Sequence, residues 1–184
     1  PAIAWGTKVI FDRYGDATIA VFPSDHLLDE KAMDIIKNSR KFVDENIVVF
    51  GISPSKPHTG YGYICPGEDL GSGYKVHDFR EKPDEKTAES YIKEGYLWNS
   101  GIFLFSASVF INEMKKYQKE MYDIFQADNP DYSSLKSLSM DYGLLEKSEN
   151  VAVVPLDLYW NDLGSFSSIY DASEKDSDGN AGSA

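Results

Sequence analysis

Three uninterrupted apolar runs constrain the fold of this chain more than any other feature of its sequence. They cover residues 18–22 (TIAVF), 47–51 (IVVFG) and 101–105 (GIFLF). A strand that is apolar on both faces belongs inside a sheet that is covered on both sides, as parallel strands of α/β proteins are. Between the first two runs, Asp29 offers an N-cap for a helix through about Asp44. Strand, helix and strand at this spacing predict a βαβ unit and an α/β fold with a parallel core.

The remaining segments add an antiparallel part to the predicted sheet. Residues 61–65 and 74–79 are rich in β-forming side chains and are joined by a glycine-rich stretch, which favours antiparallel pairing. Further elements are predicted at 83–93 (helix), 107–148 (helical), 151–154 (strand) and 165–173 (helix). We therefore expect one domain over residues 1–173, with a mixed, mostly parallel sheet and a small antiparallel excursion. Residues 174–184 are small, polar and aperiodic, which indicates a linker or disordered tail.

Charge and composition argue against nucleic acid as a partner and against a membrane-spanning or disulfide-bonded protein. The formal net charge of −12 argues against nucleic acid, although a metal ion and a few local cations could still hold a single nucleotide or sugar phosphate. No apolar run approaches the roughly 18 residues of a membrane-spanning helix, and no signal peptide is recognisable. The single cysteine, Cys65, cannot form an internal disulfide and fits a cytoplasmic protein.

Common catalytic motifs are missing, and what remains is a set of polar residues at strand ends. The chain has no G-x-x-x-x-G-K-[ST] loop, no C-x-x-C pair and no G-x-S-x-G elbow. In open α/β sheets ligands bind beyond the carboxyl ends of the strands, so such residues could converge on one cleft. Each also has a structural explanation as a turn, a helix cap or an exposed ion pair. These residues are Asp25, Glu81, Lys82, Asn99, Ser100 and Asp162.

Six segments, taken together and in order, resemble one enzyme family. They are F-P-S-D-H (22–26), G-Y-G-Y-I (60–64), F-R-E-K-P (79–83), W-N-S-G-I-F (98–103), S-M-D-Y-G-L-L-E-K (139–147) and W-N-D-L-G-S-F (160–166). This set resembles mannose-1-phosphate guanylyltransferase, also called GDP-mannose pyrophosphorylase, of the sugar nucleotidylyltransferase superfamily. The resemblance implies a Rossmann-like nucleotidyltransferase fold. It also implies Mg²⁺-dependent transfer of a guanylyl group from GTP to mannose 1-phosphate, giving GDP-mannose and pyrophosphate.

The resemblance further implies a role for each strand-end residue. Asp25 and Asp162 would bind one Mg²⁺ together, with phosphate oxygens and water completing its coordination. Lys82 would neutralise and orient the sugar phosphate for in-line attack on the α-phosphorus of GTP. The remaining substrate-binding residues would be Glu81 and Asn99, which would bond sugar hydroxyls, and Gly62, which would let the backbone approach the sugar. Asp141 and Glu146 also lie in a matching segment, but a helix-capping role explains Asp141 and we leave both out of the predicted site.

One departure from the family pattern is large. The family begins with a strand and a glycine-rich loop containing an arginine, followed by a P-K motif, and these residues are absent here. We therefore expect an internal fragment that lacks the first strand and loop and is inactive on its own. The apolar sheet edges of such a fragment would favour association, for instance as a homo-oligomer. Two alternatives stay open: another sugar-1-phosphate nucleotidylyltransferase of the same fold, or a non-catalytic regulatory subunit that binds nucleotide sugars.

Overall fold

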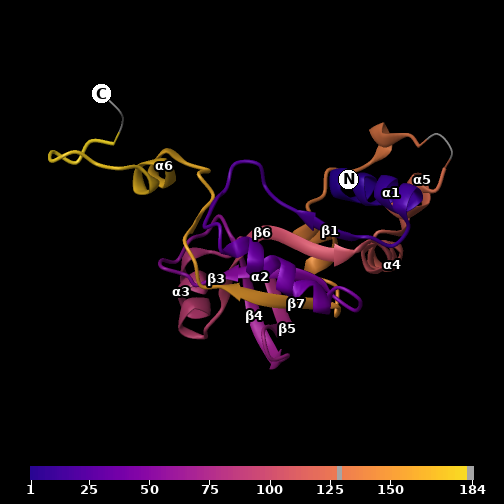
Figure 1. Cartoon of the computed structure of the whole chain (residues 1–184), viewed down its shortest axis with the longest axis horizontal. Helices are drawn as coiled ribbons and strands as arrows, with labels where there is room; N and C mark the ends of the chain where they lie inside the picture. The colour runs from indigo at the N-terminus through magenta and orange to yellow at the C-terminus, as the bar shows by residue number, and fades with distance from the viewer. Residues whose placement is uncertain (128–129, 182–184) are drawn as a thin grey trace.

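A mixed six-stranded sheet with helices on both faces forms the centre of the computed structural model, which describes residues 1–127 and 130–181 (Figure 1). In spatial order the strands are β1 (Thr18–Val21), β6 (Leu97–Ser106), β3 (Ile47–Ile52), β7 (Val151–Leu156), β5 (Tyr74–Glu81) and β4 (Gly62–Asp69). A separate two-stranded ribbon joins β2 (Leu27–Leu28) to β8 (Trp160–Asn161). The helical segments are α1 (Ala2–Tyr14), α2 (Ala32–Asn38), η1 (Ser39–Phe42), α3 (Glu85–Lys93), α4 (Ala107–Tyr117), α5 (Lys119–Phe125), η2 (Tyr132–Ser134), η3 (Asp141–Leu145) and α6 (Phe166–Ala172).

The expected mixed α/β sheet is confirmed, but the expectation that it is mostly parallel was wrong for the described strands, because β6 lies between β1 and β3 and β5 lies between β7 and β4, each running against its neighbours. Strands β1, β3, β4 and β7 run in one direction, while β5 and β6 run against them. The β1 and β3 strands of the predicted βαβ unit are parallel but are not neighbours, because β6 inserts between them. Among the strands that the structure describes, β3 and β7 are the one parallel neighbouring pair, and the other neighbours pair antiparallel.

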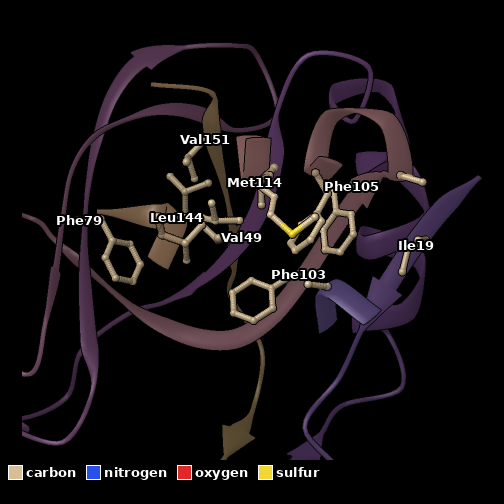
Figure 2. Packing of buried hydrophobic residues seen from close by; sticks show 14 of the residues in the cluster. Ile19, Val49, Phe79, Phe103, Phe105, Met114, Leu144 and Val151 are labelled. Carbon is tan, nitrogen blue, oxygen red and sulfur yellow. The ribbon is translucent and has the colours of Figure 1, made fainter. Parts of the chain in front are cut away.

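Alternation along the central strands builds two apolar layers, one on each face of the sheet. In β3, Ile47 and Val49 enter one cluster, whereas Val48 and Phe50 enter the other, as the two-residue period of a strand requires. Helices α1 and α4 and the turn η3 cover the first face, and α2 and α3 cover the second. Figure 2 shows the first cluster, in which Met114 of α4 lies among side chains of the sheet and of η3. Apolar cover on both faces explains why these strands carry no polar alternation.

Local signals set the ends of several helices as expected. The predicted helix over 83–93 is confirmed as α3. Asp84 caps its N-terminus, since its carboxylate accepts a hydrogen bond from the backbone N–H of Thr87 at 2.8 Å. Helix α6 has no buried residue, and Figure 1 shows it lying apart from the sheet. Of the predicted tail over 174–184, residues 182–184 lie outside the described part of the chain. Within residues 1–127 and 130–181, no helix has the length and apolar character needed to cross a membrane.

Candidate active site

A cleft of about 240 Å³ gathers four of the six predicted site residues. Gly62 of β4, Glu81 of β5, Asn99 of β6 and Asp162, directly after β8, all line it. Asp25 and Lys82 do not line the cleft, although each is joined in sequence or by an ion pair to a residue that does. Side chains distant in the sequence therefore meet in one cleft.

Strand register explains why Gly62, Glu81 and Asn99 lie side by side. Gly62 is the Cα partner of Glu81 across the β4–β5 pair. Tyr63 is the partner of Trp98 across the β4–β6 pair, so continuing that register by one residue places Gly62 beside Asn99. A Cβ on Gly62 would lie 2.6 Å from Oε2 of Glu81 and 3.3 Å from Cβ of Asn99. The glycine is thus required by the close approach of its two neighbours.

Two of the predicted strand boundaries were wrong, and the difference changes how the site is built. Asn99 was expected before a strand over 101–105, but β6 begins at Leu97 and includes it. Glu81 was expected after a strand over 74–79, but it is the last residue of β5. Both strands extend because β4 supplies backbone partners on the same side of the cleft. Strand pairing, rather than loop structure, therefore fixes Glu81 and Asn99.

The side-chain amide of Asn99 is held by two partners. Its Nδ2 donates to Oδ1 of Asp141 at 2.9 Å, and its Oδ1 accepts from the backbone N–H of Gly101 at 3.2 Å. Gly101 has a left-handed backbone (φ 72°), which glycine adopts without strain. Ser100 is fully buried, and its Oγ accepts from the backbone N–H of Ile102 at 3.3 Å, so this hydroxyl has a structural role.

Two acidic residues that the sequence analysis left out of the site belong to it. Asp141 lines the cleft, and Oε1 of Glu146 accepts from the backbone N–H of Glu81 at 3.1 Å. Asp141 is the first residue of η3 and Glu146 directly follows it. This π-helical turn is a conformation that is rare overall but often occurs at functional sites. Asp141 does lie in the first turn of η3, as the capping explanation expected, but its carboxylate also accepts a hydrogen bond from the Asn99 side chain, which the sequence did not reveal. The signal that could have identified them was the S-M-D-Y-G-L-L-E-K segment itself.

Burial and like charge both act on the acidic residues of the cleft. Burial, and then the charge of Asp141, raises the pKa of Glu81 above its ordinary value. Burial likewise raises the pKa of Asp141. Two carboxylates in a partly dehydrated cleft disfavour each other's ionisation. The floor of the cleft therefore attracts hydrogen-bond donors and cations.

Lys82 stands at the rim of the cleft in a strained conformation. Its φ of 50° is unusual for a residue with a side chain, and conformations of this kind cluster at functional sites. Its Nζ lies 3.1 Å from Oε1 of Glu81. The Lys82 side chain is 56% exposed, whereas the Glu81 side chain is only 8% exposed. The hydrogen bond to Glu81 raises the pKa of Lys82, which keeps the ammonium charged. An exposed cation beside a buried carboxylate can turn toward an incoming anion.

The β2–β8 ribbon joins the two segments that carry the predicted metal ligands Asp25 and Asp162. Leu27 pairs with Asn161 in antiparallel register, so continuing the ribbon by one residue places His26 opposite Asp162. His26 Nδ1 accepts a hydrogen bond from Nε1 of Trp160 at 3.2 Å, which ties the two strands together. Burial lowers the pKa of His26, while the charges of Asp25 and Asp162 raise it, so both carboxylates act on the same imidazole.

The aspartate pair fits a magnesium ion that shares its ligands with a substrate. Asp25 is exposed and Asp162 is half-buried in the cleft wall. The described residues contain no group of three or more His, Cys, Asp or Glu side chains that could hold a metal on their own. Two carboxylates with open positions suit Mg²⁺, which usually keeps water and phosphate oxygens in its coordination sphere. The donor set therefore fits Mg²⁺ bound together with a phosphate.

Aromatic rings form the wall of the cleft next to Asp162. Tyr61 and Trp160 line it, with ring centroids 5.4 Å apart. Tyr61 also stacks on His58 at 3.8 Å and meets Trp98 edge to face at 5.1 Å. Burial, and then Asp162, raises the pKa of Tyr61, so its hydroxyl stays protonated. Trp160 is therefore part of the cleft wall, whereas Trp98 is buried in the core beside it.

A larger groove next to the cleft shares Phe103 and Asp141 with it but contains none of the six predicted site residues. It measures about 380 Å³ and lies among α1, α4 and η3, with a lining that is mostly apolar. The smaller cleft therefore remains the candidate active site.

Comparison with known proteins gives a consistent set of similarities. A model of the nucleotidyl transferase family (NTP_transferase) matches residues 1–179. The chain is 41% identical over 199 residues to the xanthan biosynthesis protein XanB of Xanthomonas campestris pv. campestris (strain B100), covering 98% of the chain and 42% of that protein. It is 36% identical over 205 residues to a mannose-1-phosphate guanylyltransferase of Salmonella montevideo, covering 98% of the chain and 43% of the relative. The chain thus spans less than half the length of these relatives.

A solved structure shares the fold over most of the chain. The crystal structure of mannose-1-phosphate geranyltransferase from Thermus thermophilus superposes with a TM-score of 0.86 at 27% sequence identity. The superposition covers 92% of this chain and 53% of that one. The chain therefore shares its fold, over most of its length, with about half of a larger solved chain.

Proposed function

This chain belongs to the nucleotidyl transferase family, and on that premise we propose that it carries the sugar-phosphate side of a mannose-1-phosphate guanylyltransferase. The complete reaction would join mannose 1-phosphate to GTP and release GDP-mannose and pyrophosphate. The observation that carries the proposal is the convergence of Gly62, Glu81, Asn99 and Asp162 on one cleft. The relative from Salmonella montevideo, which bears this activity in its name, supports the choice of substrates.

Glu81 and Asn99 would bind the sugar. A carboxylate accepts hydrogen bonds from hydroxyl groups, while an amide can both donate and accept. Because β4, β5 and β6 fix both residues next to Gly62, the sugar ring could approach the backbone of β4 without meeting a Cβ. The aromatic wall of Tyr61 and Trp160 would exclude water on the side of Asp162.

Lys82 would bind the phosphate group of the sugar. Its ammonium group lies at the rim, 3.1 Å from Glu81, and can exchange that carboxylate for a phosphate without crossing the cleft. Holding the two anions together is the main electrostatic task of phosphoryl-type transfer, and no covalent protein intermediate is needed. Lys82 would thus orient the attacking phosphate oxygen and stabilise the charge that develops.

Asp25 and Asp162 would hold Mg²⁺ at the end of the β2–β8 ribbon. When bound, the ion supplies charge neutralisation for the phosphate oxygens. Asp25 lies two residues before β2 and Asp162 directly follows β8, and the hydrogen bond from Trp160 to His26 joins these two segments. A cytoplasmic location is part of the same proposal, since GTP is an intracellular substrate.

A substrate panel on the complete gene product tests this function. Pyrophosphate release should be fastest with mannose 1-phosphate and GTP in the presence of Mg²⁺. Glucose 1-phosphate, and UTP, ATP or dTTP in place of GTP, should each support less than about a tenth of that rate, as expected when a site selects through buried hydrogen bonds. Preference for a different sugar or nucleotide would favour the related nucleotidylyltransferase, and pyrophosphate release from no pair would contradict the proposal.

A further inference from the structure

The π-helical turn η3 contacts both of the residues proposed to read the sugar. Asp141, its first residue, accepts from Nδ2 of Asn99 at 2.9 Å. Glu146, directly after the turn, accepts from the backbone N–H of Glu81 at 3.1 Å. One short segment from a distant part of the sequence therefore contacts the two strand residues that flank Gly62 in the cleft.

The partners of Asn99 leave only one orientation for its amide group. An ionised carboxylate can only accept a hydrogen bond, so the NH₂ group must face Asp141. A backbone N–H can only donate, so the carbonyl oxygen must face Gly101. Rotating the amide by half a turn would place acceptor against acceptor and donor against donor. The remaining hydrogen-bond capacity of Asn99, one N–H and one lone pair, is thereby fixed in direction.

We infer that Asp141 is a positioning residue that holds the Asn99 amide so that Asn99 and Glu81 together recognise one sugar hydroxyl. Asn99 would donate its free N–H to the hydroxyl oxygen, and the hydroxyl would donate its proton to Glu81. The two side chains flank Gly62 closely enough for one group to reach both, since a Cβ there would lie within 3.3 Å of each. This inference rests on the proposed function.

The substrate class follows from this arrangement. A hexose 1-phosphate with the hydroxyl in place satisfies both partners, whereas the deoxy analogue leaves the half-buried donor of Asn99 and the buried acceptor of Glu81 unpaired. Leaving such groups unpaired costs more than the hydrogen bond contributes, so the wild-type protein should discriminate against one monodeoxy sugar by about tenfold to a hundredfold. Without Asp141 the amide can rotate, and most of that discrimination should disappear.

The experiment measures kcat/KM of the complete gene product for mannose 1-phosphate and for its 2-, 3-, 4- and 6-deoxy analogues. The variants are Asp141→Ala, Asp141→Leu and Asp141→Asn. The first two remove the acceptor, with Leu filling the space if the smaller residue destabilises the fold. Asp141→Asn keeps an acceptor, since its carbonyl oxygen can take the bond from Asn99.

Gln118→Leu is the matched control for the stability of the turn. Nε2 of Gln118 donates to the carbonyl oxygen of Gly143 at 2.7 Å, so Gln118 supports the same turn from outside the cleft. A residue that only stabilises η3 would behave like Gln118. A residue that orients Asn99 would not.

In the expected result, wild-type protein, Asp141→Asn and Gln118→Leu all reject one deoxy sugar, and Asp141→Ala or Asp141→Leu loses about tenfold of that rejection. KM for GTP stays unchanged throughout. If wild type turns over mannose 1-phosphate but the Ala and Leu variants keep full discrimination, the inference is overturned and the proposed function stands. If Gln118→Leu loses the discrimination together with the Ala and Leu variants of Asp141, the inference is also overturned. No turnover by wild type overturns both.

Discussion

Gly62 has little room for a side chain. A methyl group there would lie 2.6 Å from Oε2 of Glu81 and 3.0 Å from Cζ of Phe79. The Glu81 carboxylate is the end of a flexible side chain, so it should move aside while β4 keeps its fold. We therefore expect Gly62→Ala to raise KM for mannose 1-phosphate by about tenfold, as for one lost hydrogen bond to a charged group. Steady-state kinetics with varied sugar phosphate would measure this.

Gly6→Ala is the control for that substitution and a prediction in its own right. Gly6 lies inside α1, and no atom comes within 4 Å of a Cβ placed there. Alanine in a helix interior is more stable than glycine by about 1 kcal/mol, because the unfolded chain has less backbone freedom to lose. Urea unfolding should show this gain, with KM unchanged. A similar rise in KM in Gly6→Ala would show that the Gly62 effect is not local.

The raised pKa of Asp141 predicts how its substitution changes stability with pH. Because burial raises this pKa, the folded protein keeps a proton that the unfolded chain has already released. Folding then binds protons, and the free energy of unfolding falls as pH rises from below the ordinary carboxyl value to above the raised one. Asp141→Asn cannot ionise and so avoids this pH-dependent fall in the free energy of unfolding. The variant should therefore have a higher free energy of unfolding than wild type near about pH 7.

Urea unfolding across pH measures that difference. The stability advantage of Asp141→Asn should shrink toward about pH 3, where Asp141 is protonated in both states. A variant that is less stable than wild type at neutral pH, or an advantage independent of pH, would contradict the assigned cause. Gln118→Leu, which carries no titratable change, should shift stability equally at every pH.

Some residues of the candidate site could be predicted from the sequence and others could not. Asp25, Glu81 and Asp162 were predicted because they follow apolar runs and lie in segments that match a family, although each alone has an ordinary structural explanation. Asp141 was missed because its helical surroundings offered a capping explanation, and a contact with Asn99 is not visible in either local pattern. A hydrogen bond between distant segments depends on tertiary structure that local propensity does not encode.

The β2–β8 ribbon is the element on which the proposed metal site depends. It has only two residue pairs, and the Trp160 to His26 hydrogen bond at 3.2 Å adds a side-chain connection. Trp160→Phe keeps an aromatic ring in the wall but removes the donor. We expect the Mg²⁺ concentration for half-maximal activity to rise by about threefold to tenfold, since one net hydrogen bond contributes about 1 kcal/mol.

Titration of activity with Mg²⁺ at saturating sugar phosphate and GTP tests the ribbon. The rate at saturating Mg²⁺ should be close to that of wild type, because excess ion restores binding. Tyr91→Phe is a suitable control, since Tyr91 stacks on Tyr96 within the other apolar layer and lies away from the cleft. An unchanged Mg²⁺ requirement in Trp160→Phe would mean that the ribbon does not position the metal ligands.

Elements were predicted unevenly, and for identifiable reasons. The strands at 47–51 and 151–154 and the helix at 83–93 were found because apolar runs and a capping aspartate are local signals. The start of β6 was placed four residues late, at Gly101 instead of Leu97, because Asn99 and Ser100 read as a turn. The ribbon was not predicted, since two-residue strands carry no periodicity.

At the scale of the whole molecule, the sheet explains why distant segments form one site. Insertion of β6 between β1 and β3 brings Asn99 to the end of the sheet at which β4 begins. The mixed α/β class was predictable because strands apolar on both faces require cover on both sides. The strand order was not, because it depends on pairing between segments far apart in sequence.

The central claim is that Asp25 and Asp162, from opposite ends of the chain, act as one site. The most direct test compares pyrophosphate release from mannose 1-phosphate and GTP by the complete gene product carrying Asp25→Asn, Asp162→Asn or both. Each single variant should lower kcat by about a hundredfold or more with an unchanged melting temperature, because charge neutralisation by a metal contributes several kcal/mol. The double variant should be no slower than the slower single variant, since residues acting as a unit are not additive. A wild-type rate in either single variant, or effects that multiply in the double variant, would contradict the account.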